Sequence, residues 1–267
     1  MPNDFKPFLW LLKLGALLNL WLLAGTFASG AGAADPHIIV PARILFAVSA
    51  YRCLFPNRYK DNVVLHDTIL SSTFVTRVLA TFAELAFIYL LSHVIRLLNV
   101  DEVGQVDALS WVMVAAVSIS QGFVWGAIAT GRLRLYFYEE IGWANIFVAN
   151  TIASAWLYLT VDSLGAGETL LQLNLLFGLF YLPWQAVHLR SLLVDARSRE
   201  ATDEAQERVS SQLISSCLGR SIHETNRSTS AEDWGGLVGL TWMTAYWATL
   251  IPLWVHRIVV TVGAGPG

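Results

Sequence analysis

Residues Ile69–Ile95 read ILSSTFVTRVLATFAELAFIYLLSHVI, a nearly unbroken apolar stretch. Arg77 and Glu84 are the only residues in it that carry a formal charge. About 20 mostly apolar residues in a helix are enough to cross a bilayer. The stretch is longer than that, so it predicts a transmembrane helix.

The composition of the whole chain points the same way. Of its 267 residues, 55% are hydrophobic and 14% are charged, and the mean hydropathy is +0.53. Soluble domains carry about 25% charged residues, so an ordinary soluble enzyme is excluded, and so is a disordered chain. The net charge of −3 gives no basic surface, so nucleic acid is not an expected partner.

Six further stretches are long and apolar in the same way, which makes seven. They cover about Pro7–Gly30, Ile38–Phe55, Ala108–Gly131, Leu135–Val161, Leu170–Leu193 and Gly235–Val262. We therefore predict an all-α polytopic transmembrane helix bundle with about seven spans. Six of them lie in residues 1–193, a polar inner segment covers residues 194–234, and the seventh lies in residues 235–262.

The first stretch has a second interpretation. Lys6 and Lys13, the apolar run Leu14–Phe27 and the small residues Ala31 to Ala33 also fit a cleavable signal peptide. Residues 1–34 are then either a retained span or a removed leader, and removal would leave six spans. In both cases residue 35 lies outside.

The basic residues predict the orientation, because lysine and arginine collect in cytoplasmic loops. With the N-terminus inside and the C-terminus outside, twelve of the 17 lysines and arginines lie inside, two outside and three within spans. The inner group includes Arg52, Arg58 and Lys60, which either bind phospholipid head groups or only set the topology. In the inner segment, Asp195–Glu207 predicts a charged helix and Ser210–Ser230 a mobile loop.

The third stretch carries the clearest polar face. Thr73, Arg77, Thr81 and Glu84 are spaced 4, 4 and 3, which puts them on one side of a helix. A charge at the bilayer centre costs about 2.5–3.5 kcal/mol on the insertion scale, so both charges need a reason. Arg77 and Glu84 lie about 10 Å apart along the axis. We expect each to meet a group on another helix, either in a ligand-binding polar core or as a structural tie.

Two later stretches carry polar faces of the same kind. In the fifth, Glu139 and Asn150 share a face with Ser154. In the sixth, a polar stripe with spacings of 7, 4 and 3 contains Asn174, Tyr181, Gln185 and His188. Pro183 lies within this stripe and removes a backbone hydrogen bond of the helix. These side chains join those of the third stretch as candidate ligand-binding residues, and helix packing by hydrogen bonds is the alternative.

Small residues mark the fourth stretch. Ser118, Gly122 and Gly126 recur at four-residue spacing, which lets two helix backbones approach closely. We expect packing at this strip, and a membrane-protein partner or a second copy of the chain is a candidate for it.

No motif assigns a reaction. The sequence has no phosphate-binding loop, nucleophile elbow, dinucleotide fingerprint or zinc motif, so we predict no metal or cofactor and name no catalytic residue. Three functions stay open. One is a bundle that binds or transports a small amphipathic or lipidic molecule around Arg77 and Glu84. The others are a structural subunit of a membrane complex and an intramembrane enzyme with Glu84, Glu139 or His188 as acid or base.

Overall fold

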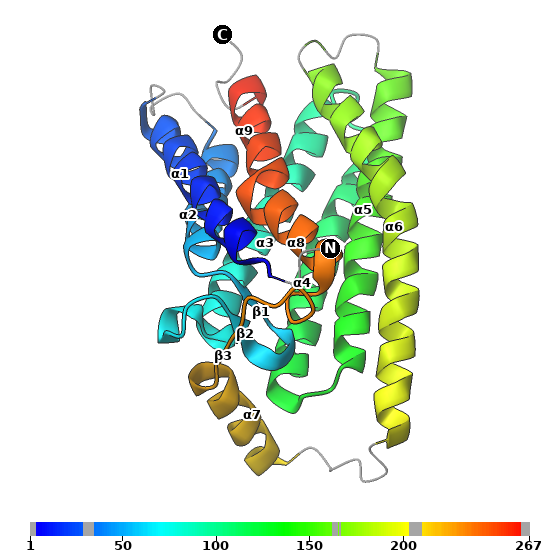
Figure 1. Ribbon diagram of the computed structural model, residues 1–267. Helices are drawn as coiled ribbons and strands as arrows, with labels where there is room; N and C mark the ends of the chain where they lie inside the picture. The colour runs from blue at the N-terminus through cyan, green and yellow to red at the C-terminus, as the bar shows by residue number, and fades with distance from the viewer. Residues whose placement is uncertain (1–3, 29–34, 162–164, 166, 203–209, 263–267) are drawn as a thin grey trace. The chain divides into compact units, whose positions relative to one another are not determined.

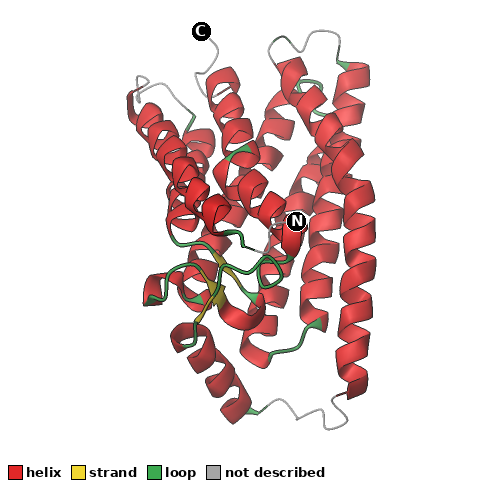
Figure 2. Ribbon diagram, viewed as in Figure 1, coloured by secondary structure: helices red, strands yellow, loops and turns green. Residues whose placement is uncertain are grey.

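Figure 1 shows the computed structural model, which describes residues 4–28, 35–161, 165, 167–202 and 210–262. Over these ranges the chain is all-α, as predicted, apart from three two-residue strands (Figure 2). The long helices are α1 (Lys6–Ala28), α2 (Pro36–Leu54), α3 (Thr73–Leu98), α4 (Gly104–Thr130), α5 (Arg134–Thr160) and α6 (Gly167–Thr202). The shorter elements are α7 (Ser211–His223), α8 (Gly236–Met243), the π-helical turn η3 (Thr244–Ala248), α9 (Leu250–Val262), the 3-10 turns η1 (Lys60–Asn62) and η2 (Ile69–Ser71), and the strands β1 (Asn57–Arg58), β2 (Val63–Val64) and β3 (Asn226–Arg227).

Six helical segments in the described part of the chain are long and apolar enough to cross a membrane. They are Lys6–Phe27, Pro36–Leu54, Thr73–Leu98, Gly104–Thr130, Gly167–Val194 and Gly236–Val262. These six helices are compatible with an integral membrane helix bundle. The fifth expected span exists as α5, with 27 residues, but is not among the six. Charges at its start and the polar Asn145 and Asn150 within it lower its hydropathy.

The chain divides into two compact units, and the boundary falls inside α3. The first unit combines Met1–Phe87 with Gly219–Gly267, and the second is Ile88–Leu218. The first unit therefore holds α1, α2, the start of α3, the small sheet, α8, η3 and α9. The second holds the end of α3, α4, α5, α6 and most of α7.

In the first unit, α1 packs along α2 and η3. Leu9, Ala16 and Leu22 are buried on one face of α1, whereas Leu17 and Trp21 on the other face are exposed. Gly15 permits the close approach, because a Cβ there would lie 2.5 Å from the Cβ of Ala248.

Arg43 is a charged residue within the second apolar stretch, and its guanidinium is hydrogen-bonded to the end of α1. Its Nε donates to Thr26 Oγ1 (3.0 Å) and its Nη2 donates to Thr26 O (2.8 Å). The guanidinium also lies 3.9 Å from the centre of the Phe27 ring. Arg43 thus caps the carbonyl end of α1, where a cation is favoured by the helix dipole.

The last span is not one continuous α-helix. Pro252 has no N–H to donate to Ala248 O, and a proline ring conflicts with the carbonyl four residues before it. The helix widens into η3 just before this point, where Thr249 N donates to Thr244 O (3.0 Å). Asn19 on α1 is fully buried, and its Nδ2 donates to Trp247 O in this turn (2.9 Å).

The segment between α6 and the last span is more ordered than predicted. Much of Ser210–Ser230, expected as a loop, forms α7, and the following residues form β3. Strand β3 pairs in parallel with β2, and β2 pairs antiparallel with β1. Trp234 is fully buried and its indole Nε1 donates to Ser228 O (2.8 Å). This aromatic anchor explains why a polar segment is held in place. The expected charged helix after the sixth span is present as far as Thr202, and residues 203–207 lie outside the described residues.

The second unit packs α5 between α4 and α6. The close approaches use glycines on α5 and α6: a Cβ at Gly142 would overlap Ser120 Oγ, and one at Gly178 would overlap Thr151 Oγ1. The predicted small-residue strip on α4, Ser118, Gly122 and Gly126, does not pack as closely as these glycines do. A Cβ at Gly122 would meet no described atom within 4 Å, and Ser118 is exposed. At Gly126, by contrast, a Cβ would lie 3.2 Å from Leu135 Cδ1, so only part of the strip faces open space within the described residues.

Candidate functional site

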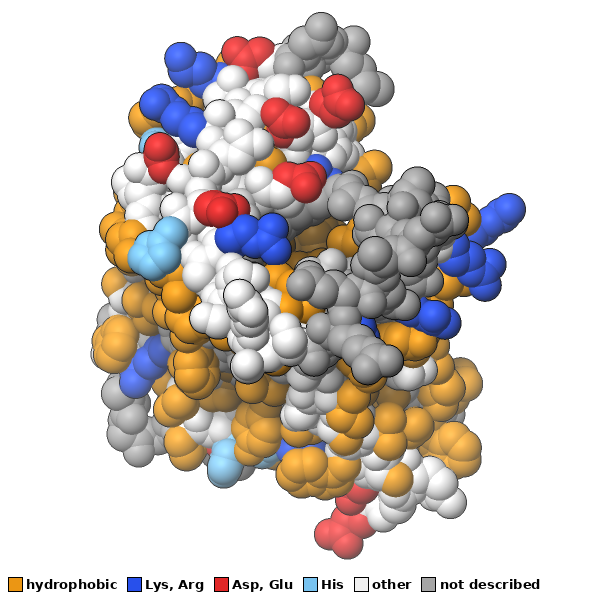
Figure 3. Space-filling model, turned by 90° about the horizontal axis from the view of Figure 1, so that it is seen from below, with side chains coloured by type: hydrophobic (Ala, Val, Ile, Leu, Met, Phe, Trp, Pro, Cys, Tyr) orange, Lys and Arg blue, Asp and Glu red, His pale blue; other side chains and the backbone are white. Residues whose placement is uncertain are grey.

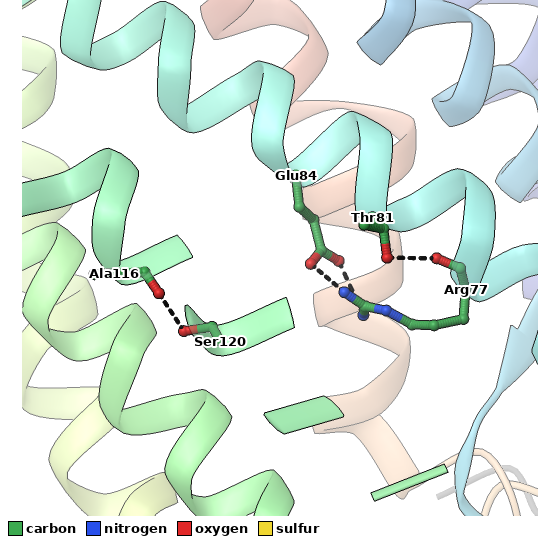
Figure 4. Close-up of polar contacts among 5 residues, drawn as sticks. All are labelled: Arg77, Thr81, Glu84, Ala116 and Ser120. Carbon is green, nitrogen blue, oxygen red and sulfur yellow. Dashed lines mark hydrogen bonds and ion pairs between the residues drawn. The ribbon is translucent and has the colours of Figure 1, made fainter. Parts of the chain in front are cut away.

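Arg77 and Glu84 form a direct ion pair on α3 (Figure 4). Nη2 of Arg77 lies 2.6 Å from Glu84 Oε2, and Nη1 donates to Oε1 at 3.3 Å. Both side chains are buried. From the axial separation of about 10 Å we expected these side chains to be too far apart to pair closely without help, and this expectation was wrong. The two residues share a helix face two turns apart, and the long arginine side chain lies along that face and spans most of the separation.

The hydroxyls of the two threonines on this predicted face bond to a neighbouring loop and to the backbone of α3. Thr73 Oγ1 donates to Asn62 Oδ1 (2.7 Å), which ties the start of α3 to the preceding loop. Thr81 Oγ1 donates to the carbonyl of Arg77 (3.0 Å). The spacing therefore placed the four residues on one helix face but did not indicate the partner of any of them.

A second buried arginine, Arg52 in the last turn of α2, lies near the same aromatic ring as Arg77. The guanidinium carbons of Arg52 and Arg77 lie 5.2 Å and 5.6 Å from the centre of the Tyr59 ring. Arg52 also lies 5.2 Å from the centre of the Trp247 ring in η3. We call Arg52, Tyr59, Arg77, Glu84 and Trp247 the charged core of the first unit.

Asn57 fixes one side of the Arg52 guanidinium. Nη1 of Arg52 donates to Asn57 Oδ1, and Nη2 donates to Asn57 O (3.3 Å). Asn57 is itself held, because its Nδ2 donates to Ser71 O (3.0 Å) and to Thr76 Oγ1 (2.5 Å). The Nε of Arg52 is buried and has no hydrogen-bond partner among the described residues.

The charges of this core do not balance. The buried ionic side chains described in the first unit are Arg52, Arg77 and Glu84. Glu84 neutralises Arg77, while Arg52 contacts only a neutral amide, a backbone carbonyl and two aromatic rings in the described structure. A buried charge without a counter-ion is expensive, which makes the Arg52 environment the most unusual electrostatic feature of the unit.

The other six predicted ligand-binding residues belong to the second unit, where several of them tie α5 to α6. Asn174 Nδ2 donates to Ser154 Oγ (2.9 Å) and to Asn150 Oδ1 (3.3 Å), and all three are buried. Tyr181 packs between rings, with its ring centre 4.7 Å from that of Phe147 and 5.1 Å from that of Phe177. These contacts agree with the helix-packing alternative.

Nearer the start of α5, Glu140 interacts with two residues of the polar stripe on α6, Gln185 and His188. Gln185 Nε2 donates to Glu140 Oε2 (2.7 Å) and to Glu140 O (2.9 Å), and His188 Nε2 lies 3.8 Å from Glu140 Oε1. The sequence pattern pointed to Glu139, which is buried, and missed the role of its neighbour Glu140. The spacing on α5 alone could not identify which glutamate faces α6.

A histidine outside the spans has a defined protonation state. Lys13 Nζ lies 3.0 Å from His66 Nε2, and an ammonium can only donate, so Nε2 accepts and His66 is neutral. Burial lowers the pKa of His66, and the nearby charges of Lys13 and Arg227 lower it further. The same lysine lies 4.7 Å from the centre of the Trp10 ring.

Neither a metal cluster in the described part of the chain nor a similarity to known proteins points to a function. Among the described residues, no group of three or more histidine, cysteine, aspartate or glutamate side chains could hold a metal ion. Comparison of the chain with protein-family models, with curated proteins and with solved structures finds no match.

Proposed function

We propose that the chain is a multi-pass membrane protein that binds or transports a small amphipathic molecule at the charged core of the first unit. The observation that supports this is the burial of Arg52, Arg77 and Glu84 within helices that are otherwise apolar. A charge at the bilayer centre disfavours membrane insertion by about 2.5–3.5 kcal/mol, and Glu84 lies near the middle of α3. The pair of Arg77 and Glu84 could serve only a structural role, but this role leaves the charge of Arg52 unexplained. A bound ligand explains that third charge.

The surroundings of the core suit a molecule with a polar and an apolar end. Tyr59 and Trp247 present ring faces to the guanidinium groups. Trp247 also contacts Tyr246 (ring centres 4.5 Å apart), which packs edge-to-face with Phe87 (6.4 Å). Aromatic rings pack against hydrocarbon as well as against cations.

The test is mass spectrometry of the small molecules extracted from protein purified in mild detergent, with an absorption spectrum of the same sample. We expect one class of amphipathic molecule at a fixed stoichiometry, and we expect Arg77→Gln with Glu84→Gln to retain less of it. Arg43→Gln is the control, because Arg43 lies in an apolar helix but caps α1. Extracts of folded wild-type protein that contain only bulk detergent and lipid would contradict the proposal.

A structural subunit of a membrane complex is the second candidate, and the second unit favours it. Its polar side chains are largely engaged with one another, and Gly122 on α4 faces open space. On the face shown in Figure 3, exposed hydrophobic side chains lie beside charged ones. Gly122→Leu should then reduce recovery of a partner or dimer in detergent, whereas Gly104→Leu, also open on α4, should not.

For topology we propose seven spans, with α5 crossing despite its polar residues, the N-terminus inside and the C-terminus outside. The distribution of lysine and arginine supports this orientation. We also propose that α1 stays in the mature protein as the first span, because Asn19 and Thr26 on α1 bond to η3 and to α2.

A further inference from the structure

We propose that Arg52 is an anion-binding residue that takes the carboxylate or phosphate group of the amphipathic ligand. This inference rests on the proposed function and specifies its ligand as acidic. Four observations carry it: the free edge of the guanidinium, the two aromatic rings near it, the local charge surplus and the position of Arg52 in its helix.

The guanidinium has one edge in use and one edge free. Asn57 takes a hydrogen bond from each terminal nitrogen, and the bond from Nη2 is long, at 3.3 Å. The Nε–H has no partner among the described residues, although the side chain is only 6% exposed. Nε and a neighbouring Nη together form a fork that matches two oxygens of a carboxylate or phosphate. The free edge therefore has the donor geometry for an oxyanion.

Two aromatic residues from different elements contact this guanidinium. Tyr59 precedes η1, and Trp247 belongs to η3, where the backbone of the last span departs from α-helical geometry. Single π-helical turns inside α-helices are frequent at functional sites. Rings over the guanidinium leave its edges for hydrogen bonds and offer apolar contact to a hydrocarbon chain attached to the anion.

An anion at Arg52 would also balance the charge. The buried charges described in the first unit sum to one positive charge, because Glu84 is already paired with Arg77. Bound next to Arg52, a monoanion would make the core neutral. The surplus positive charge therefore favours an acid over an alcohol, an amine or a sugar as the ligand.

The position of Arg52 along α2 favours an acidic head group. Arg52 lies in the last turn of a helix that ends at Leu54, so in a membrane it lies close to the interface where head groups reside. Its neighbours on the chain include Arg58, whose Nη1 donates to Asp233 O (2.6 Å). Arg58 is thus engaged, whereas the Nε of Arg52 has no hydrogen-bond partner among the described residues.

The test uses three probes with the same twelve-carbon chain: lauric acid, dodecyl phosphate and 1-dodecanol. Native mass spectrometry of the full-length protein in a nonionic detergent measures the bound fraction of each. We expect the two acids to bind at least tenfold more tightly than the alcohol. Arg52→Gln should abolish this preference, whereas Arg43→Gln on the same helix should keep it. Arg52→Lys, which retains the charge but lacks the fork, should weaken acid binding by roughly tenfold.

The outcomes separate the inference from the function it rests on. If 1-dodecanol binds as tightly as the acids and folded Arg52→Lys or Arg52→Gln leaves binding unchanged, the Arg52 inference is wrong and the proposed function stands. If no probe binds and no molecule co-purifies, the proposed function fails as well. Competition by inorganic phosphate alone would support the anion site and identify free phosphate, rather than a lipid head group, as its source.

Discussion

Arg77 and Glu84 are seven residues apart on α3 and are joined by two hydrogen bonds, the shorter measuring 2.6 Å. The ion pair lies along the helix and keeps both charges on one element. Because Glu84 is paired with Arg77, no described buried carboxylate of the first unit balances the charge of Arg52 on α2. Among the described residues of the first unit, one buried arginine is therefore paired with a carboxylate and the other is not.

The ion pair predicts non-additive effects on stability. Arg77→Ala or Glu84→Ala should each destabilise the protein by about 3–5 kcal/mol, because each leaves the other charge buried and unpaired. The double variant should cost clearly less than the sum of the two single variants. The free energy of unfolding in detergent measures all three. Additive effects would show that the two side chains act independently.

Two glycines on α1 make a matched comparison of packing. A Cβ at Gly15 would lie 2.5 Å from Ala248 Cβ, whereas one at Gly25 would meet no described atom within 4 Å. Gly15→Ala should destabilise by about 1–3 kcal/mol through overpacking, and Gly25→Ala should be neutral or stabilise by about 0.5–1 kcal/mol. Melting temperatures in detergent distinguish them, and equal effects would mean that α1 does not pack closely on η3.

His66 predicts how stability depends on pH. The pKa of His66 is lowered from its ordinary 6.5 by burial and by the charges of Lys13 and Arg227. The unfolded chain therefore binds the proton more readily, so this stabilising contribution is complete above pH 6.5 and is lost as the pH falls through the lowered value. Melting temperatures between pH 8 and pH 5 should fall at the acid end. His66→Gln should flatten this slope, and an unchanged slope would remove His66 as its cause.

The proposed topology predicts which side of the membrane each loop faces. Asp101→Cys and Glu168→Cys, both at exposed positions, should react with an impermeant thiol reagent added outside intact cells. Arg132→Cys should react only after permeabilisation. The native Cys53 and Cys217 are buried and should give a low background. Labelling of Arg132→Cys from outside, with the other two protected, would invert the orientation.

Local sequence patterns predicted the helices well. Apolar runs gave α1 as Pro7–Gly30 and α4 as Ala108–Gly131, against observed bounds of Lys6–Ala28 and Gly104–Thr130. Hydropathy works here because a long apolar helix satisfies its own backbone groups, whatever its neighbours are. The interruption at η3 could also have been predicted, since Pro252 is visible in the sequence and removes a backbone donor.

The partners of the polar side chains could not be predicted in the same way. Helical spacing put Arg77 and Glu84 on one face but did not indicate that they would bond to each other. The environment of Arg52 depends on Asn57 in the following strand and on Trp247 in the last span, a pairing that no local pattern encodes. Such contacts depend on tertiary packing, which is why the sequence placed Arg52 only among residues for head-group binding or topology.

Ligand binding at Arg52 is tested most directly by an experimental structure of the protein in lipid nanodiscs, determined with a rigid binder bound to it. We expect non-protein density beside the charged core, with its polar end at the Nε of Arg52 and its chain along Tyr59 and Trp247. A well-resolved core in which Arg52 is instead paired with a carboxylate of the protein, and no additional density is present, would contradict this expectation.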